Sequence, residues 1–284
     1  MSRPVDVLLE FLEAEQARGV SHVHLDQGAR EGMRQLFNES RAGAKTVASV
    51  LPERVEMPAE IPPPPPAVVC MDVAIAGSSR AEKIANLRRQ AESWAPARAL
   101  GSLRETMIFS TGNPDARIML ISEAPSYQEE KERQPFVGPA GQKINKILET
   151  MGLSREEVYL ANIVKFRPAS PNQTINTRRP TPEEMAACMP ILRAEVSIIQ
   201  PQCIIALGET TAEGLLGLSG HISTMRGSWH TFEGTPVRVT YHPSHLLSTS
   251  GVSQTKRLLW EDMLSVMEKI KLPISERQRG FFLP

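Results

Sequence analysis

The sequence is poor in cysteine, has no excess charge of either sign and lacks long apolar runs. Its three cysteines form no CxxC pair and therefore indicate no disulfide framework; they are Cys70, Cys188 and Cys203. Lysine and arginine together number 32, as do aspartate and glutamate, so any basic surface for nucleic acid has to be local. No apolar run approaches the roughly 18 residues that a membrane-spanning helix requires, and no membrane partner is expected.

Several signatures of common enzymes are also missing. The chain has neither the GxGxxG fingerprint of dinucleotide-binding folds nor the GxxxxGK phosphate loop, which argues against an unrelated nucleotide-binding α/β protein. It also lacks the GxSxG motif of α/β-hydrolases and the HExxH motif of zinc proteases, so the sequence indicates neither of these two enzyme classes. The N-terminal apolar segment contains acidic residues, unlike a secretory signal peptide. A location in the bacterial cytoplasm or nucleoid is therefore expected.

Composition predicts four segments: a helical N-terminal segment at 1–41, a proline-rich linker at 42–77, a main domain at 78–271 and a C-terminal tail at 272–284. The linker contains an unbroken proline run from Pro62 to Pro66, which is typical of a semi-rigid, extended connection. In the first segment His22 and His24 form an HxH pair, but no third ligand lies nearby in the sequence. No metal site is therefore predicted.

The main domain alternates between apolar strands and amphipathic helices. Strands are expected at residues 117–122, 158–164, 203–207 and 237–241. Helices are expected at residues 80–97, 141–152, 181–199, 210–216 and 256–270. This alternation predicts an α/β fold in which helices cover both faces of a parallel sheet. Ligands of such sheets bind beyond the carboxyl ends of the strands.

Three of the expected strands end on a polar side chain. Glu123 follows the first strand, Asn162 lies near the end of the second, and His242 follows the fourth. A buried amide or imidazole has to be hydrogen-bonded, and each residue taken singly also fits an ordinary structural role. Because parallel strands end at the same edge of a sheet, we expect the three side chains to form a site there.

The loops at this edge carry basic and apolar side chains. The segment 165–180 has no acidic residue, so it is either a solvated loop or a surface for a nucleic-acid backbone. Two leucines follow His242 between small polar residues; apolar wedges of this kind prise bases apart, although such leucines are also common in cores. We predict DNA contacts from Lys165, Arg167, Arg178, Arg179, Arg226, Ser244, His245, Leu246 and Leu247.

Several motifs, in this order, resemble those of the uracil-DNA glycosylase superfamily. They are SEAPSYQEE from Ser122, PFVGPAGQ from Pro135, ANIVKFRP from Ala161 and TYHPSHLL from Thr240. The resemblance runs from about Leu87 to Ile270 and is closest to the family 4 type. It implies a three-layer αβα fold with a four-stranded parallel sheet. It also implies a DNA repair enzyme that flips out uracil and hydrolyses its N-glycosidic bond to leave an abasic site.

The resemblance assigns three residues to the base itself. Phe136 matches the aromatic side chain that stacks on the flipped uracil, and Asn162 matches the amide that reads the edge of the base. His242 matches the histidine near uracil O2. Bond cleavage leaves negative charge on the uracil, and a preorganised donor at O2 would stabilise that charge.

Two acids and a wedge are also implied. Glu123 and Ala124 match the loop that holds the water and the base edge, and Glu129 matches the acid that closes the pocket near C5. Either carboxylate could orient the water and stabilise the sugar cation, and the sequence does not rank them. Either Leu246 or Leu247 would be the intercalating side chain.

Family 4 members usually carry an iron–sulfur cluster, and at its ligand positions this sequence departs from the pattern. Only Cys188 falls on a ligand position; Phe166 replaces a second cysteine, and Trp94 and Ala97 lie where a CxxC pair belongs. A [4Fe–4S] cluster requires four thiolates. We therefore expect no iron–sulfur cluster and no other cofactor, and predict that Phe166 and Trp94 fill its place by apolar packing.

Three functions stay open on the sequence. Ser122 and Ser126 replace glycines of the first motif, and their side chains narrow the loop. The alternatives to uracil excision are therefore a glycosylase for hypoxanthine or xanthine and a catalytically weak DNA-binding member of the superfamily. Single- or double-stranded DNA is the expected partner of a monomer. Residues 278–283 loosely resemble a sliding-clamp-binding peptide, but they also fit a tail whose phenylalanines pack on the domain.

Overall fold

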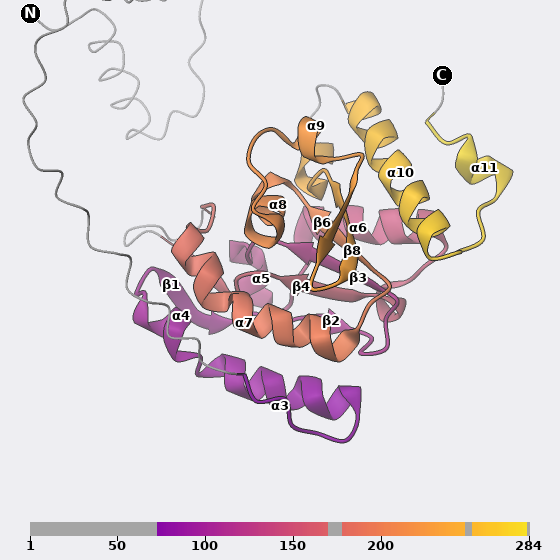
Figure 1. Ribbon diagram of the computed structural model, residues 1–284. Helices are drawn as coiled ribbons and strands as arrows, with labels where there is room; N and C mark the ends of the chain where they lie inside the picture. Colours follow the sequence, from indigo (N-terminus) through magenta and orange to yellow (C-terminus); the bar gives the residue numbers. More distant parts are fainter. Residues whose placement is uncertain (1–72, 170–177, 248–251, 283–284) are drawn as a thin grey trace, which may run out of the picture. The chain divides into compact units, whose positions relative to one another are not determined.

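The computed structural model describes residues 73–169, 178–247 and 252–282 (Figure 1). The N-terminal segment and nearly all of the linker expected from the sequence lie outside these residues, as does the middle of the basic loop. Among the helices that the structure describes, none combines the length and apolarity needed to cross a bilayer.

A six-stranded sheet forms the centre of the domain. In spatial order its strands are β2 (Thr111–Gly112), β4 (Tyr159–Asn162), β3 (Ile118–Ser122), β6 (Cys203–Leu207), β8 (Thr235–Thr240) and β7 (Trp229–Phe232). The inner strands β4, β3, β6 and β8 run parallel. They are the four strands expected from the sequence, whereas β2 and β7 extend the sheet at its two edges as antiparallel strands.

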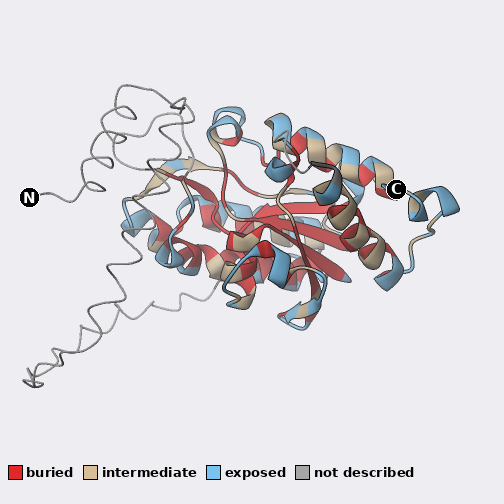
Figure 2. Cartoon of the chain, turned by 90° about the horizontal axis from the view of Figure 1, so that it is seen from above, coloured by how far each residue is buried: buried red, intermediate tan, exposed pale blue. Residues whose placement is uncertain are grey.

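The sheet separates two apolar cores because successive side chains of a strand point to opposite faces. Along β3, Met119 and Ile121 join one core, while Ile118 and Leu120 join the other. The first core is covered by α3 (Arg80–Glu92), α4 (Ala95–Ala99), α7 (Pro182–Ile199) and α8 (Glu209–Leu216). The second is covered by α6 (Gly138–Met151) and α10 (Val252–Lys269). The αβα architecture is thereby confirmed, and Figure 2 shows the buried strands between helices with exposed outer faces.

Local sequence fixes where the main helices begin and end. Thr181 and Glu184 form a capping box at the start of α7, as the sequence predicts. Helix α6 buries Ile144 and Leu148 on one face and ends at Gly152, whose φ of 80° suits glycine. The expected helix 80–97 is instead two helices, because the chain leaves the helical conformation at Trp94 and Pro96 opens α4.

Smaller elements complete the domain. They are the antiparallel pair β1 (Leu103–Met107) and β5 (Phe166–Pro168), α5 (Tyr127–Glu132), η1 (Arg155–Glu157), α9 (Ile222–Met225), η2 (Pro243–Leu246) and α11 (Glu276–Arg279). Helix α11 belongs to the C-terminal tail, which packs on the domain. The indole of Trp260 donates to the Gln278 carbonyl at 2.7 Å, and the Phe281 ring meets the Trp260 ring edge-on. The described part of the tail therefore packs on the domain through Phe281, while clamp binding stays a prediction.

Candidate active site

Glu123, Asn162 and His242 all lie at the carboxyl edge of the parallel sheet. Asn162 is the last residue of β4 and pairs in register with Ser122 at the end of β3, so Glu123 follows directly beside it. His242 lies beyond the end of β8, next to the end of β6. There Gly208 allows a close approach, because a Cβ at this position would lie 3.1 Å from the His242 Cβ. The structure therefore brings the three residues to one edge.

The Asn162 side chain is buried and incompletely satisfied. It is 2% exposed, and its Nδ2 has no hydrogen-bond partner among the described residues. A buried amide donor without a partner costs about 1–3 kcal/mol, so such a group is expected to be satisfied by a water or by a bound ligand. The adjacent backbone is fixed, because the Lys165 ammonium donates to the Asn162 carbonyl at 2.8 Å.

His242 is held as a neutral imidazole. Burial, and secondarily the nearby His245, lowers its pKa from 6.5 to about 4. The Ser244 backbone N–H donates to Nδ1 at 3.2 Å, and the Ser244 hydroxyl lies 2.7 Å from the same nitrogen. Because Nδ1 accepts, the hydrogen-bond network assigns the proton to Nε2. His242 can therefore offer one N–H donor at neutral pH.

Glu123 is a partly buried carboxyl. Burial raises its pKa above the usual value, while the Thr210 hydroxyl and the positive charge of Arg179 act in the opposite direction. Its backbone carbonyl accepts from the Val164 N–H at 3.0 Å, which ties the loop after β3 to the chain after β4. Ala124, the next residue, is buried.

Glu129 is committed to the backbone of its own loop. One carboxylate oxygen accepts from the Ser126 N–H at 2.6 Å, within the capping box that starts α5, and the other accepts from the Phe136 N–H. The two serine-for-glycine changes are thus partly explained, because Ser126 is the cap of α5. Both Glu129 oxygens are thus occupied by backbone donors, and which of the two acids orients a water stays a prediction.

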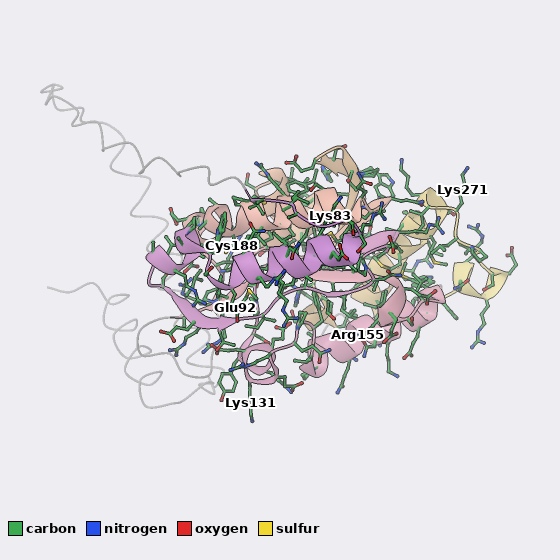
Figure 3. The ribbon with its side chains drawn as sticks, turned by 90° about the horizontal axis from the view of Figure 1, so that it is seen from below. Lys83, Glu92, Lys131, Arg155, Cys188 and Lys271 are labelled. Atoms are coloured by element: carbon green, nitrogen blue, oxygen red, sulfur yellow. The ribbon has the colours of Figure 1, made fainter. Side chains whose placement is uncertain are left out.

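Phe136 is buried and adopts a left-handed backbone conformation, with φ of 55°. The Arg155 guanidinium donates to its carbonyl at 2.8 Å and to the Pro135 carbonyl at 3.0 Å. Gly141 allows this arrangement, because a Cβ there would lie 1.9 Å from the Phe136 carbonyl oxygen. The sequence did not point to Arg155, which lies near α6 (Figure 3).

Two of the basic residues predicted to contact DNA are buried. Lys165 has no exposed surface and forms an ion pair with Glu195, and Arg167 is buried and pairs with Glu130 at 2.6 Å. Side chains this deeply buried and already paired are not presented to a phosphate in this structure, which argues against the DNA contacts expected from Lys165 and Arg167. Sequence reasoning missed the partner Glu195 because it comes from the C-terminal half of α7, 30 residues further along the chain.

The other predicted basic residues are more accessible but already paired. Arg178 binds the Glu184 carboxylate with both terminal nitrogens, Arg179 pairs with Glu213, and Arg226 pairs with Asp262 at 2.9 Å. Residues 170–177 of the same loop lie outside the described residues. The DNA contacts expected from these three arginines stay predictions.

The two candidate wedge leucines differ in exposure. Leu246 is 9% exposed and packs in the core beside α6 and α10, whereas Leu247 is 45% exposed. The neighbouring Ser244 and His245 are also exposed. An intercalating side chain has to project from the protein surface, so the exposure of the two residues favours Leu247 as the wedge.

The residues at the expected cluster positions form an apolar core instead. Trp94, Ala97, Phe166 and Cys188 are all buried in the same cluster. The Trp94 indole donates to the Ala187 carbonyl at 2.7 Å, and burial raises the pKa of the Cys188 thiol to about 11. No group of three potential ligands occurs among the described residues. The residues present, with one protonated thiol, do not fit an iron–sulfur cluster.

Comparison with known proteins points to one family. Residues 109–264 match the model of the uracil DNA glycosylase superfamily. The Type-4 uracil-DNA glycosylase of Thermotoga maritima is 38% identical over 172 residues, which cover 59% of this chain and 85% of the relative. That of Archaeoglobus fulgidus is 36% identical over 156 residues, covering 52% and 75%. The Type-5 enzyme of Pyrobaculum aerophilum is 28% identical over 175 residues, covering 56% and 72%.

Proposed function

The chain belongs to the uracil DNA glycosylase superfamily, and from this premise we propose that it is a DNA repair glycosylase that removes uracil by hydrolysing its N-glycosidic bond. The relatives named Type-4 uracil-DNA glycosylase support this function. The single observation that carries it on the structural side is the buried, unpartnered Nδ2 of Asn162 at the carboxyl edge of the sheet.

Asn162 reads the base in this proposal. Its Nδ2 donates to uracil O4, and its Oδ1 accepts from uracil N3–H, which satisfies the orphaned donor. Turned over, the same amide would suit cytosine, so its orientation decides the specificity. The Lys165 ammonium bound to the Asn162 carbonyl holds the backbone from which that side chain projects.

His242 and Glu123 carry the chemical step. The bond between C1′ and N1 of the nucleotide breaks, and its electron pair goes to the uracil, whose O2 accepts from the Nε2–H of neutral His242. Glu123 orients a water toward C1′ and stabilises the positive sugar. The water oxygen bonds C1′, and its proton passes to the Glu123 carboxylate and from there to the uracil anion, giving neutral uracil and an abasic site. A preorganised donor of this kind is worth about 3–4 kcal/mol.

Base flipping supplies the substrate to this pocket. Unstacking costs a few kcal/mol, and stacking on an aromatic face such as Phe136 returns about 1–3 kcal/mol. The exposed Leu247 fills the space that the base leaves. No cofactor has a role in this scheme, because the residues at the cluster positions pack as an apolar core.

The test is uracil release from a labelled single-stranded oligonucleotide with one uracil, read by alkaline cleavage at the abasic site. We expect wild type to cleave, and Asn162→Ala and His242→Ala to lose about 10²–10³ in single-turnover rate. The exposed His221, replaced by alanine, is the matched control and should leave the rate unchanged. A wild type silent on uracil but active on hypoxanthine or xanthine would overturn the substrate. Silence on all three with DNA binding retained would overturn the activity.

A further inference from the structure

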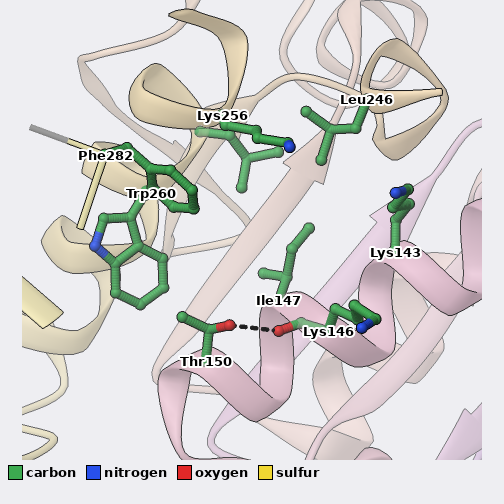
Figure 4. Close-up of a pocket in the computed structure, with 9 residues that line it drawn as sticks. Lys143, Lys146, Ile147, Thr150, Leu246, Lys256, Trp260 and Phe282 are labelled. Atoms are coloured by element: carbon green, nitrogen blue, oxygen red, sulfur yellow. Dashed lines mark hydrogen bonds between the residues drawn. The ribbon is translucent and has the colours of Figure 1, made fainter. Parts of the chain in front are cut away.

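A groove bordered by three lysines lies between α6 and α10, apart from the base pocket. It measures about 250 Å³, and its lining includes Lys143, Lys146, Lys256, Leu246, Trp260 and Phe282. Figure 4 shows Lys143 and Lys146 projecting from α6 and Lys256 from across the groove. No acidic residue lines it. The groove therefore combines an apolar floor with a rim of one charge.

These lysines differ from the arginines that the sequence assigned to DNA. None of Lys143, Lys146 and Lys256 forms an ion pair within the described part of the chain, whereas the arginines at 178, 179 and 226 each bind a carboxylate. An ammonium without a carboxylate partner is available to a phosphate at no cost of breaking an ion pair. Because the net charge of the chain is zero, a polyanion binds where unpaired cations gather, as these three lysines do around one groove.

The groove continues directly from the candidate site. Both α6 and α10 contact η2, the turn that follows His242. Leu246 in this turn lines the groove, and the next residue, Leu247, is the exposed wedge candidate. Lys143 and Lys256 lie in the N-terminal halves of α6 and α10, which begin at the carboxyl edge of the sheet, and Lys146 lies one turn further along α6. A strand leaving the base pocket past Leu247 would therefore meet the groove.

We propose that this groove binds the DNA strand flanking the flipped nucleotide, with the three lysines contacting successive phosphates; this inference rests on the proposed function. The occupant is a single strand. Phe282 at the rim is 49% exposed. An exposed aromatic face of this kind stacks on an unpaired base, whereas the faces of a base within a duplex are already covered by its neighbours. A surface for the DNA backbone is thereby placed on α6 and α10, where the sequence analysis had not looked for one.

The test is the salt dependence of binding to a fluorescent, uracil-free oligonucleotide. Each phosphate contact to a single strand contributes about 0.7 to the slope of log affinity against log salt. The variant with Lys143→Gln, Lys146→Gln and Lys256→Gln should lower that slope by about 2. A matched control removes three positive charges elsewhere, Lys83→Gln, Arg88→Gln and Lys271→Gln, on α3 and after α10 (Figure 3). The control should keep the wild-type slope.

Excision separates this inference from the proposed function. If wild type releases uracil, the lysine variant should lose rate at low concentration of a long oligonucleotide. It should keep the wild-type rate on a short one that ends at the lesion. An unchanged salt slope in the lysine variant, or an equal fall in the control, overturns the groove while active wild type leaves the glycosylase standing. A lowered slope in a protein silent on uracil supports the groove and rejects the glycosylase.

Discussion

The carboxylate of Glu129 accepts a hydrogen bond from the backbone N–H of Phe136. Arg155 donates to the carbonyl of the same residue, so both backbone polar groups of Phe136 are held. A left-handed conformation costs an aromatic residue on the order of 1–3 kcal/mol and persists only where the surroundings enforce it. The candidate stacking ring is thus preorganised by an acid and a base from different elements.

Removing the Glu129 carboxylate should therefore lower the stability of the protein more than removing a carboxylate at the surface. Glu129→Ala leaves the buried Phe136 N–H and the half-buried Ser126 N–H without their acceptor, at about 1–3 kcal/mol for the buried group and less for the other. We expect urea unfolding to show a loss of about 2–4 kcal/mol, together with a raised KM for uracil-containing DNA. The control Glu132→Ala, on the exposed side of α5, should stay within about 0.5 kcal/mol of wild type. Equal stability of the two variants would contradict the clamp.

Lys165 is expected to act through stability and the placement of Asn162. Lys165→Met leaves Glu195 buried and without its ammonium partner, although Tyr159 still donates to it at 3.2 Å. Breaking such a buried pair costs about 3–5 kcal/mol. The double variant Lys165→Met with Glu195→Leu should cost less than Lys165→Met alone, because no charge stays buried. Urea titrations of the two variants check this, and a double variant less stable than the single one would argue against it.

The sequence predicted the strands and the strand-end residues because both depend on local pattern. Runs such as Cys203–Leu207 are apolar throughout, and the structure has a strand with these bounds. Parallel strands necessarily end at one edge, so Glu123, Asn162 and His242 could be grouped without coordinates.

Pairing over long sequence distances escaped the sequence analysis. Lys165 and Arg167 look like exposed loop cations until Glu195 and Glu130 are placed beside them. The edge strand β7 is largely exposed and so lacks the apolar signature of a buried strand. Arg155 is the first residue of η1, and the capping pattern of Ser154 and Glu157 predicts where this helix begins. The same pattern gives no indication that Arg155 binds the carbonyl of Phe136.

His242 should stay neutral well below the pH at which an ordinary histidine titrates. Its pKa in the folded protein is about 4, against 6.5 for the ordinary value. The unfolded chain therefore takes up a proton between these values that the folded protein does not. This contribution to stability is complete above pH 6.5 and falls as the pH drops toward 4.

NMR of the histidine Cε1–H signals, assigned by comparison with His242→Gln, measures this titration directly. We expect the chemical shift of the His242 signal at pH 5.5 to equal its value at pH 7.5. The variant should also lose less stability than wild type between pH 7 and 5. A His242 midpoint near 6.5 would remove the argument for a neutral donor.

The stability of the apolar core at the cluster positions should depend on the volume of its side chains. The purified protein should be colourless. Phe166 is fully buried, with the Arg98 guanidinium 4.5 Å from its ring centroid. Phe166→Ala should cost about 3–5 kcal/mol, whereas Phe282→Ala, at a half-exposed ring, should cost far less. Pure protein should show no absorption band from about 380 to 420 nm, where iron–sulfur clusters absorb. Such a band, together with stoichiometric iron, would show that the chain binds a cluster despite its lost cysteines.

The two adjacent leucines after His242 should separate stability from base flipping. Leu246 is buried between α6 and α10, so Leu246→Ala should lower the free energy of unfolding by about 2–5 kcal/mol. Leu247 is exposed, so Leu247→Ala should leave stability within about 0.5 kcal/mol. It should slow excision from duplex DNA more than from a single strand, where the base needs no unpairing. Urea unfolding and single-turnover excision on both substrates measure the two effects. If Leu247→Ala slowed both substrates equally, its side chain would not be the wedge, because a wedge acts only where bases are stacked and paired.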